Sequence, residues 1–121
     1  MTDHHQTIKL DGKEIIPNAD AVINPQRQSC NYPFKSLCGA GVAYKLIQAI
    51  NIKKGYGMLE CENLLQYVAM GTVCDIVDLK DENRYFVTKG LEEINNTENY
   101  GLKCLIDMTG IKNGVNVYSL G

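Results

Sequence analysis

A single short run of strand-forming residues precedes a long stretch of helical character, and this imbalance limits what the chain can fold into. The run Ala21-Val22-Ile23 is closed by Asn24-Pro25, because proline lacks the N–H that sheet pairing needs. We predict a short buried strand there. A lone strand leaves its backbone N–H and C=O groups without partners. The chain is therefore expected to be part of a larger α/β domain whose other strands lie upstream of Met1.

Four segments after this strand are predicted to be helices, the first two because their apolar residues repeat at helical spacing. In the first, Val42, Leu46 and Ile50 share one face. The predicted helices start after Gly41, near Glu60, after an N-cap at Asp81 and at about Gly101, and they end at Gly55, Asp75, Asn95 and Met108. The remaining segments are expected to be a loop with a turn at Asp11-Gly12, a long loop over residues 24–38 anchored by Tyr32 and Phe34, and a strand or linker over residues 114–121.

Composition favours one folded domain. The 121 residues are 45% hydrophobic and 21% charged, a balance typical of globular proteins, and a chain of this length usually forms one core. The formal net charge of −2 supplies no general attraction to a polyanion, so contact with nucleic acid needs a local patch or bound cations. No apolar run reaches the roughly 20 residues that span a bilayer, so we expect a soluble, cytoplasmic protein without membrane contact.

The five cysteines include no C-x-x-C pair. An odd and scattered set fits neither a disulfide framework nor a zinc knuckle. We therefore expect small, buried, apolar residues in a reducing compartment at Cys30, Cys38, Cys61, Cys74 and Cys104.

The only two histidines are adjacent and follow an aspartate, as Asp3-His4-His5. Neutral imidazole binds divalent transition metals, and a neighbouring carboxylate can either bind the ion or orient a histidine. The triplet therefore indicates a metal site. A disordered terminus or the remnant of a tag would also produce it, and the three residues alone do not separate these interpretations.

A second candidate is Asp75, which lies between Val73-Cys74 and Ile76-Val77. A carboxylate among such neighbours is expected to be buried, and burial of its charge is costly unless a cation or hydrogen-bond donors compensate. The alternative is a position in the last turn of a helix, where Asp75 would face solvent.

The third candidate is Cys38-Gly39-Ala40-Gly41, at the predicted start of a helix. Glycine lets a ligand approach the backbone, and the free N–H groups at a helix N-terminus favour an anion such as phosphate. Two glycines at this spacing also occur where a tight turn or close helix packing is needed.

Six motifs occur together in the chain, beginning with the Asp-His-His triplet. They are Thr2-Asp3-His4-His5, Ala21-Val22-Ile23-Asn24-Pro25, Tyr32-Pro33-Phe34, Leu37 to Leu46, Gly71 to Val77 and Glu82-Asn83-Arg84. In this order, over about residues 2–105, they resemble the RecJ branch of the DHH phosphoesterase superfamily. The resemblance implies the C-terminal part of a DHH phosphoesterase domain, mostly helical, with one or two short strands of a parallel sheet.

The resemblance also implies a site that hydrolyses phosphodiesters with two divalent cations, Mn²⁺ or Mg²⁺. Its catalytic residues would be Asp3, His4, His5 and Asp75. His4 and Asp75 would be the metal ligands, and so must lie close together, while His5 faces the scissile phosphate and Asp3 supports both histidines. Further phosphate contacts are implied for Arg27, Gly39, Ala40 and Gly41.

The family pattern extends beyond both ends of this sequence. An Asp-x-Asp motif and another aspartate are expected before the triplet, where the chain has only Met1 and Thr2, and a DHH-associated domain is expected after it. Residues 1–121 are therefore interpreted as a partial DHH phosphoesterase domain. We expect it to be inactive alone, because two cations roughly 4 Å apart need more ligands than His4 and Asp75. Gln6 and Asp78 also depart from the pattern, which commonly has Glu and Pro there, but neither is an expected ligand.

For the intact protein the resemblance implies a 5′-to-3′ single-stranded-DNA exonuclease of DNA repair and recombination, with single-stranded DNA and single-strand-binding protein as partners. One alternative is another DHH phosphoesterase, which hydrolyses cyclic dinucleotides, oligonucleotides or pyrophosphate. The other is a noncatalytic module that binds a protein partner. Self-association of the chain alone would be non-native, because absent strands would leave apolar surface exposed.

Overall fold

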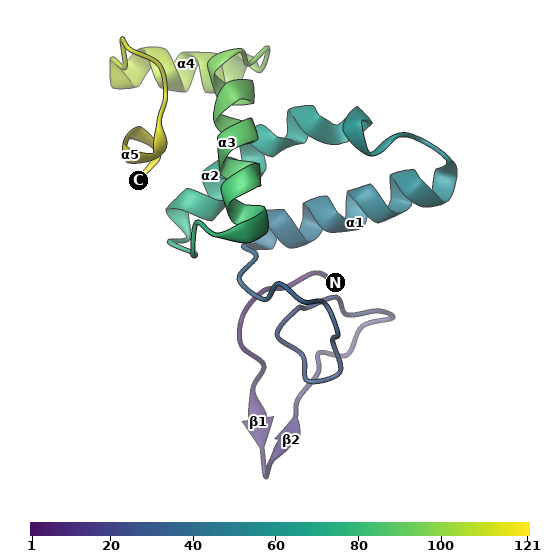
Figure 1. Cartoon of the computed structure of the whole chain (residues 1–121). Coiled ribbons are helices and arrows are strands. Elements are labelled where there is room, and N and C mark those ends of the chain that lie inside the picture. The colour runs from purple at the N-terminus through teal and green to yellow at the C-terminus, as the bar shows by residue number, and fades with distance from the viewer.

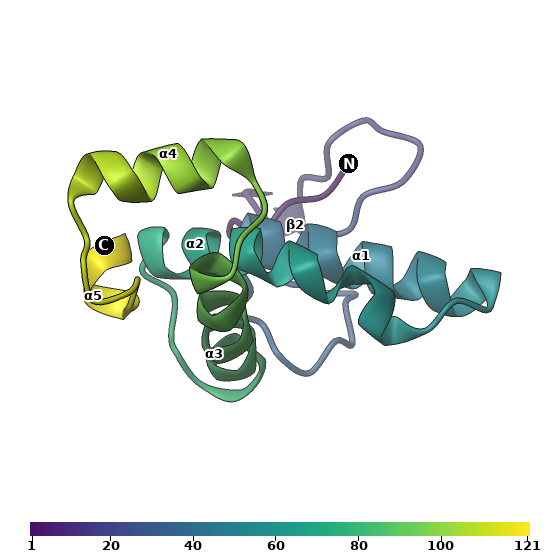
Figure 2. The same cartoon turned by 90° about the horizontal axis from the view of Figure 1, so that it is seen from above.

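The computed structural model describes residues 1–121, except for the side chains of residues 58–60. Its elements are β1 (Lys9–Leu10), β2 (Lys13–Glu14), α1 (Gly39–Lys54), η1 (Met58–Leu64, a 3₁₀ helix), α2 (Leu65–Cys74), α3 (Asp81–Asn95), α4 (Tyr100–Thr109) and α5 (Val117–Leu120). The helices gather on one side of the loop-rich N-terminal region, and the β1–β2 hairpin points away from them (Figure 1). Seen from above, α4 and α5 lie opposite the C-terminal end of α1 (Figure 2).

The regular sheet is one small hairpin. β1 and β2 pair antiparallel, Lys9 with Glu14 and Leu10 with Lys13. The turn predicted between them is confirmed, since Asp11 and Gly12 both have positive φ, at 50° and 75°. Two such residues in succession match the twist of a hairpin. The flanking residues pair instead of forming the loop that the sequence predicted.

Parallel pairing is limited, in the part of the chain described, to one bridge between Thr2 and Ile23. The Asp3 N–H donates to the Ile23 carbonyl at 2.9 Å, and the Ile23 N–H donates to the Met1 carbonyl at 3.0 Å. The prediction of a buried strand at residues 21–23 is wrong, because Ile23 pairs on one side only and is 41% exposed. A larger parallel sheet stays a prediction.

The first two predicted helices are present with shifted starts. Helix α1 begins at Gly39, directly after its N-cap Cys38, so the two glycines lie in its first turn rather than in a loop. It ends at Gly55, whose φ of 78° is the left-handed geometry that favours glycine. Helix α2 begins at Leu65 and not near Glu60, because the 3₁₀ helix η1 comes first.

The boundaries of the other helices also differ slightly from the predicted ones. The N-cap of α3 is Lys80 rather than Asp81, and Asn99 caps α4 by accepting from the Leu102 N–H. The tail forms the short helix α5 instead of a strand or linker, because the Asn116 side chain and Ser119 cap each other's N–H groups. Over the helices whose residues are described, none is long and apolar enough to cross a membrane.

The core lies where α2 packs against α3. At Gly90 of α3 an added Cβ would lie 2.3 Å from the Leu65 carbonyl oxygen, so the two backbones are in contact. Tyr32 and Phe34 pack against this core, as predicted. Its buried residues on this side are Leu37, Val42, Tyr44, Cys61, Leu65, Val68 and Phe86.

The cysteines divide into two groups. Cys38 and Cys61 are buried, as predicted, and Cys30 is half-buried. Cys74 and Cys104 are exposed, which corrects the prediction for both. Cys74 is the last residue of α2, where the helix leaves the core, and Cys104 lies on α4, none of whose residues is buried.

Candidate metal and phosphate site

His4 and Asp75, far apart in the sequence, meet at one edge of the molecule. His4 follows the residues that pair with Ile23, and Asp75 is the C-cap of α2. His4 Nδ1 lies 3.4 Å from Asp75 Oδ2. The two candidate ligands are therefore neighbours, as their expected role requires. Asp75 was predicted to be buried, but its side chain is 43% exposed, because α2 ends beside it. The His4 side chain is 18% exposed.

Close packing between α1 and α2 brings Asp75 to this position. A Cβ at Gly71 would lie 3.0 Å from the Ala40 Cβ, so only glycine gives this spacing without a shift. Beside it, the buried Cys38 Sγ lies 3.4 Å from Thr72 Oγ1, which donates to the Val68 carbonyl at 2.6 Å. The start of α1 is thus fixed against the end of α2.

The first turn of α1 also contacts His4. A Cβ at Gly39 would lie 3.4 Å from His4 Cδ2, which places the imidazole against the helix N-terminus. The first N–H groups of a helix have no partner within the helix. In α1 the Gly41 N–H donates to Cys38 Sγ at 3.4 Å. Of the three predicted phosphate contacts in this turn, Gly39 lies beside the His4 ring.

Asp3 organises the triplet through one carboxylate oxygen. Its Oδ1 accepts from the His4 N–H at 2.8 Å and from the His5 N–H at 3.2 Å, and lies 2.7 Å from His5 Nδ1. The hydrogen bond from the His5 side chain, followed by that from the His5 N–H, lowers the pKa of Asp3. The rings of His4 and His5 lie 4.3 Å apart, and the His5 side chain is 76% exposed. Asp3 therefore holds His5 at the surface beside His4.

Arg27 and His5 line one cavity of about 280 Å³, together with Asp3 and Asn24. Arg27 Nη1 donates to the Val22 carbonyl at 2.8 Å. Its Nε is buried and has no hydrogen-bond partner among the described residues. The structure thus brings Arg27 to the same side of the triplet as His5, with part of its guanidinium already bound to the backbone.

The pair His4 and Asp75 fits as two ligands of one cation. An imidazole nitrogen and a carboxylate oxygen are both ligands that Mn²⁺ accepts, and a spacing of 3.4 Å suits an ion about 2.1 Å from each. Within the described side chains, no group of three or more His, Cys, Asp or Glu residues could hold a metal ion. The spacing of His4 and Asp75 thus fits two of the ligands that one cation needs.

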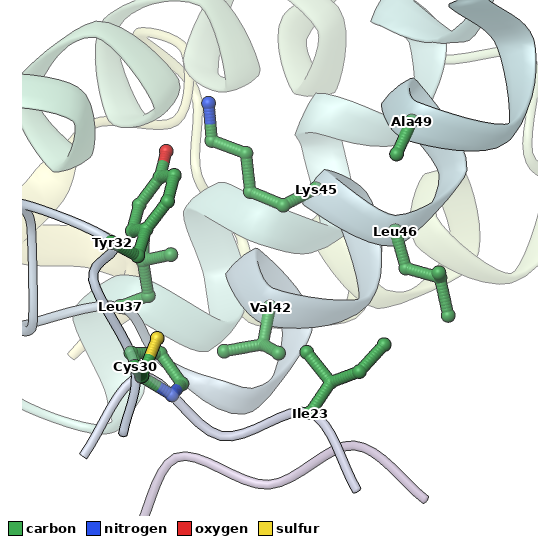
Figure 3. A pocket seen from close by; sticks show the side chains of 9 residues that line it. Ile23, Cys30, Tyr32, Leu37, Val42, Lys45, Leu46 and Ala49 are labelled. Carbon is green, nitrogen blue, oxygen red and sulfur yellow. The ribbon is translucent and has the colours of Figure 1, made fainter. Parts of the chain in front are cut away.

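A second cavity, of about 190 Å³, lies along α1 and has a different character (Figure 3). Tyr32 and Lys45 stand together at one end, and Val42 lines the apolar part. Lys45 Nζ lies 2.8 Å from Glu82 Oε1, and the Tyr32 hydroxyl donates to the same carboxylate at 2.8 Å. Glu82 thus neutralises Lys45. These contacts of the Glu-Asn-Arg motif were not predicted, although the motif itself was visible in the sequence.

The comparisons with known proteins define the class to which these features belong. The model of the DHH family, N-terminal domain, matches residues 1–72, which include the triplet, Arg27, the start of α1 and Gly71. This match covers more than half of the chain. The protein belongs to the DHH family.

Within that family the similar proteins include single-stranded-DNA-specific exonucleases named RecJ. The protein from Bacillus subtilis (strain 168) is 44% identical over 110 residues, which cover 91% of this chain and 13% of the relative. That from Haemophilus influenzae is 39% identical over 101 residues, 78% of this chain and 17% of the relative. That from Escherichia coli (strain K12) is 35% identical over 118 residues, 89% of this chain and 20% of the relative. The resemblance read from the motifs is confirmed, and the chain spans at most a fifth of these relatives.

Proposed function

We propose that this chain forms part of a single-stranded-DNA-specific exonuclease that hydrolyses phosphodiester bonds with divalent cations. The relatives named RecJ support the substrate, because they match most of the chain. The observation that carries the proposal is the distance of 3.4 Å between His4 Nδ1 and Asp75 Oδ2, at the N-terminus of α1. This distance supports the proposal, because an imidazole and a carboxylate at this spacing can share a cation, and the N-terminus of a helix favours phosphate.

In this proposal His4 and Asp75 hold one Mn²⁺ or Mg²⁺ of a two-ion site. When bound, such ions activate a water molecule and stabilise the leaving oxygen. The second ion needs ligands beyond this pair, since the described residues contain no larger group of ligands, whereas water molecules can complete the coordination of the first ion. The 121-residue chain alone is therefore proposed to be inactive.

The remaining site residues act on the substrate. Asp3 fixes the His5 ring through the contact of 2.7 Å, which directs an exposed imidazole toward the phosphate. Arg27 shares the His5 cavity and contributes positive charge. Residues 39–41 form the first turn of α1, so the positive end of the helix dipole also favours phosphate there. We further propose that digestion runs from 5′ to 3′ and that the protein contacts single-strand-binding protein. It would act in DNA repair and recombination in the cytoplasm.

The test uses the full-length gene product that carries these residues and, beside it, the 121-residue chain. With Mn²⁺ and end-labelled single-stranded DNA we expect degradation by the full-length protein and none by the chain. His4→Ala and Asp75→Asn each remove a ligand and should abolish activity. Glu98→Gln is the control, because Glu98 is 95% exposed and pairs only with Lys103 among the described side chains.

Three results would contradict the proposal. Degradation by the 121-residue chain, lost on His4→Ala, would show that the chain alone completes a site. Preference of the full-length protein for cyclic dinucleotides, short oligonucleotides or pyrophosphate in the same assay would place it in another branch of the family. Inactivity on every substrate, with wild-type folding, would favour a noncatalytic module.

A further inference from the structure

One residue of the Glu-Asn-Arg motif lies in the core and has no part in the site described above. Asn83 on α3 is fully buried, with an exposed fraction of 0%. Its Nδ2 donates to the Ser36 carbonyl at 2.6 Å and to the Asp78 carbonyl at 2.9 Å. A side-chain amide has two N–H donors, so both are used. Asn83 thus joins two loops that are distant in sequence.

Each of these loops leads to one half of the proposed metal pair. Ser36 precedes Cys38, the N-cap of α1, and the next residue, Gly39, packs against the His4 ring. Asp78 lies three residues after Asp75, in the loop that connects α2 to α3. The two bonds of one buried amide therefore fix the segment behind His4 relative to the segment that carries Asp75.

The first turn of α3 also contacts α1 directly. Glu82, next to Asn83, accepts from Tyr32 and pairs with Lys45 of α1. Lys45 Nζ also lies 5.3 Å from the centre of the Phe86 ring. The first turn of α3 is thus anchored to α1, which makes it a rigid base from which Asn83 reaches both loops.

Among the described residues, the side-chain amide of Asn83 uses its two donors but not its acceptor. Its Oδ1 is buried and has no hydrogen-bond partner among the described residues. A buried acceptor without a partner is unfavourable, so the two hydrogen bonds to the Ser36 and Asp78 carbonyls must outweigh this cost. We propose that Asn83 is a positioning residue, which holds Asp75 against His4 through the Ser36 and Asp78 carbonyls. This role rests on the proposed function of the pair.

The same helix offers a matched control. Asn95 of α3 donates from Nδ2 to the Leu91 and Val115 carbonyls at 2.8 and 3.0 Å, and its Oδ1 accepts from the Val115 N–H at 2.7 Å. It joins α3 to the segment before α5, away from His4 and Asp75. Asn83→Ala and Asn95→Ala each remove an amide that bridges two carbonyls, but only the first affects loops of the proposed site.

The experiment is NMR on the 121-residue chain without metal. The readout is the nuclear Overhauser effect between the His4 ring and the Gly39 Hα protons, which their contact predicts. We expect Asn83→Ala to reduce this signal several-fold and Asn95→Ala to leave it unchanged, with urea unfolding measured for both. Asn83→Ser keeps one donor and should give an intermediate signal, and it replaces Asn83→Ala if that variant does not fold. An unchanged signal in the Asn83 variant, or an equal loss in Asn95→Ala, would overturn the role.

Added Mn²⁺ separates this inference from the proposed function. In the wild-type chain Mn²⁺ should broaden the His4 and Asp75 signals together, and Asn83→Ala should raise the concentration required by about 10-fold, the usual cost of losing a residue that supports metal ligands. Absence of broadening at both residues in the wild type would refute the metal pair. The metal-free comparison of Asn83→Ala with Asn95→Ala would still decide whether Asn83 positions the two segments.

Discussion

Gly90 tests whether α2 and α3 pack as closely as the structure indicates. An added Cβ would lie 2.3 Å from the Leu65 carbonyl oxygen and 2.4 Å from the Ala69 Cβ. Non-bonded carbon contacts are favourable only near about 3.5–4.0 Å. The first obstacle is backbone and cannot rotate away, so Gly90→Ala must push α3 away from α2 by about 1 Å. Interiors are packed too densely to absorb such a shift without loss.

The expected magnitude follows from two opposing effects. Overpacking costs about 1–3 kcal/mol, and contact with a main-chain atom favours the upper end. Replacing glycine by alanine inside a helix returns about 1 kcal/mol. We therefore expect the free energy of unfolding to fall by about 2 kcal/mol, measured by urea denaturation followed by circular dichroism.

The matched control is Gly57→Ala. Nothing lies within 4 Å of a Cβ at Gly57, and its φ of −68° suits alanine. That variant should be as stable as the wild type or more stable by up to about 1 kcal/mol. If Gly90→Ala were also as stable as the wild type, the close approach of α2 and α3 would be wrong.

Three further predictions concern the contacts around the site. Gly71→Ala should weaken Mn²⁺ binding in electron paramagnetic resonance titrations, since the added methyl group separates the end of α2 from α1; unchanged affinity would contradict this. Thr72→Val removes the contact with Cys38 and the hydrogen bond to the Val68 carbonyl, and should lower the free energy of unfolding by about 1 kcal/mol in urea; no loss would show that these two contacts are not stabilising. Burial and the hydrogen bond to Glu82 raise the pKa of Tyr32, so the folded state favours the protonated phenol. Its contribution is complete below about pH 10 and is lost as the pH rises toward the folded pKa, so Tyr32→Phe should flatten the fall of the urea midpoint above about pH 10; parallel curves would refute this.

The helices were predictable because their signal is local. Apolar residues at 3.6-residue spacing identified α1 and α2, and the left-handed glycine at position 55 marked the end of α1. The start of α2 was misplaced, because over seven residues a 3₁₀ helix and an α-helix bring nearly the same positions to one face. In the tail, the capping residue Asn116 determined a short helix that alternating apolar residues had concealed.

The site was predictable only in part, because no local pattern contains it. The order of the motifs indicated that His4 and Asp75 belong together, but their approach depends on the packing of Gly39 and Gly71 between segments distant in sequence. Periodicity predicted that α2 ends at Asp75, but it did not decide between a buried carboxylate and one that faces solvent, and the structure leaves Asp75 partly exposed. The buried bonds of Asn83 have no signature in sequence at all.

The central claim is that one divalent cation binds between residues 4 and 75. A crystal of the chain grown with Mn²⁺, and measured for anomalous scattering, tests it directly. We expect a peak about 2.1 Å from both His4 Nδ1 and Asp75 Oδ2. A manganese peak elsewhere, with these two side chains in contact but without an ion, would contradict it.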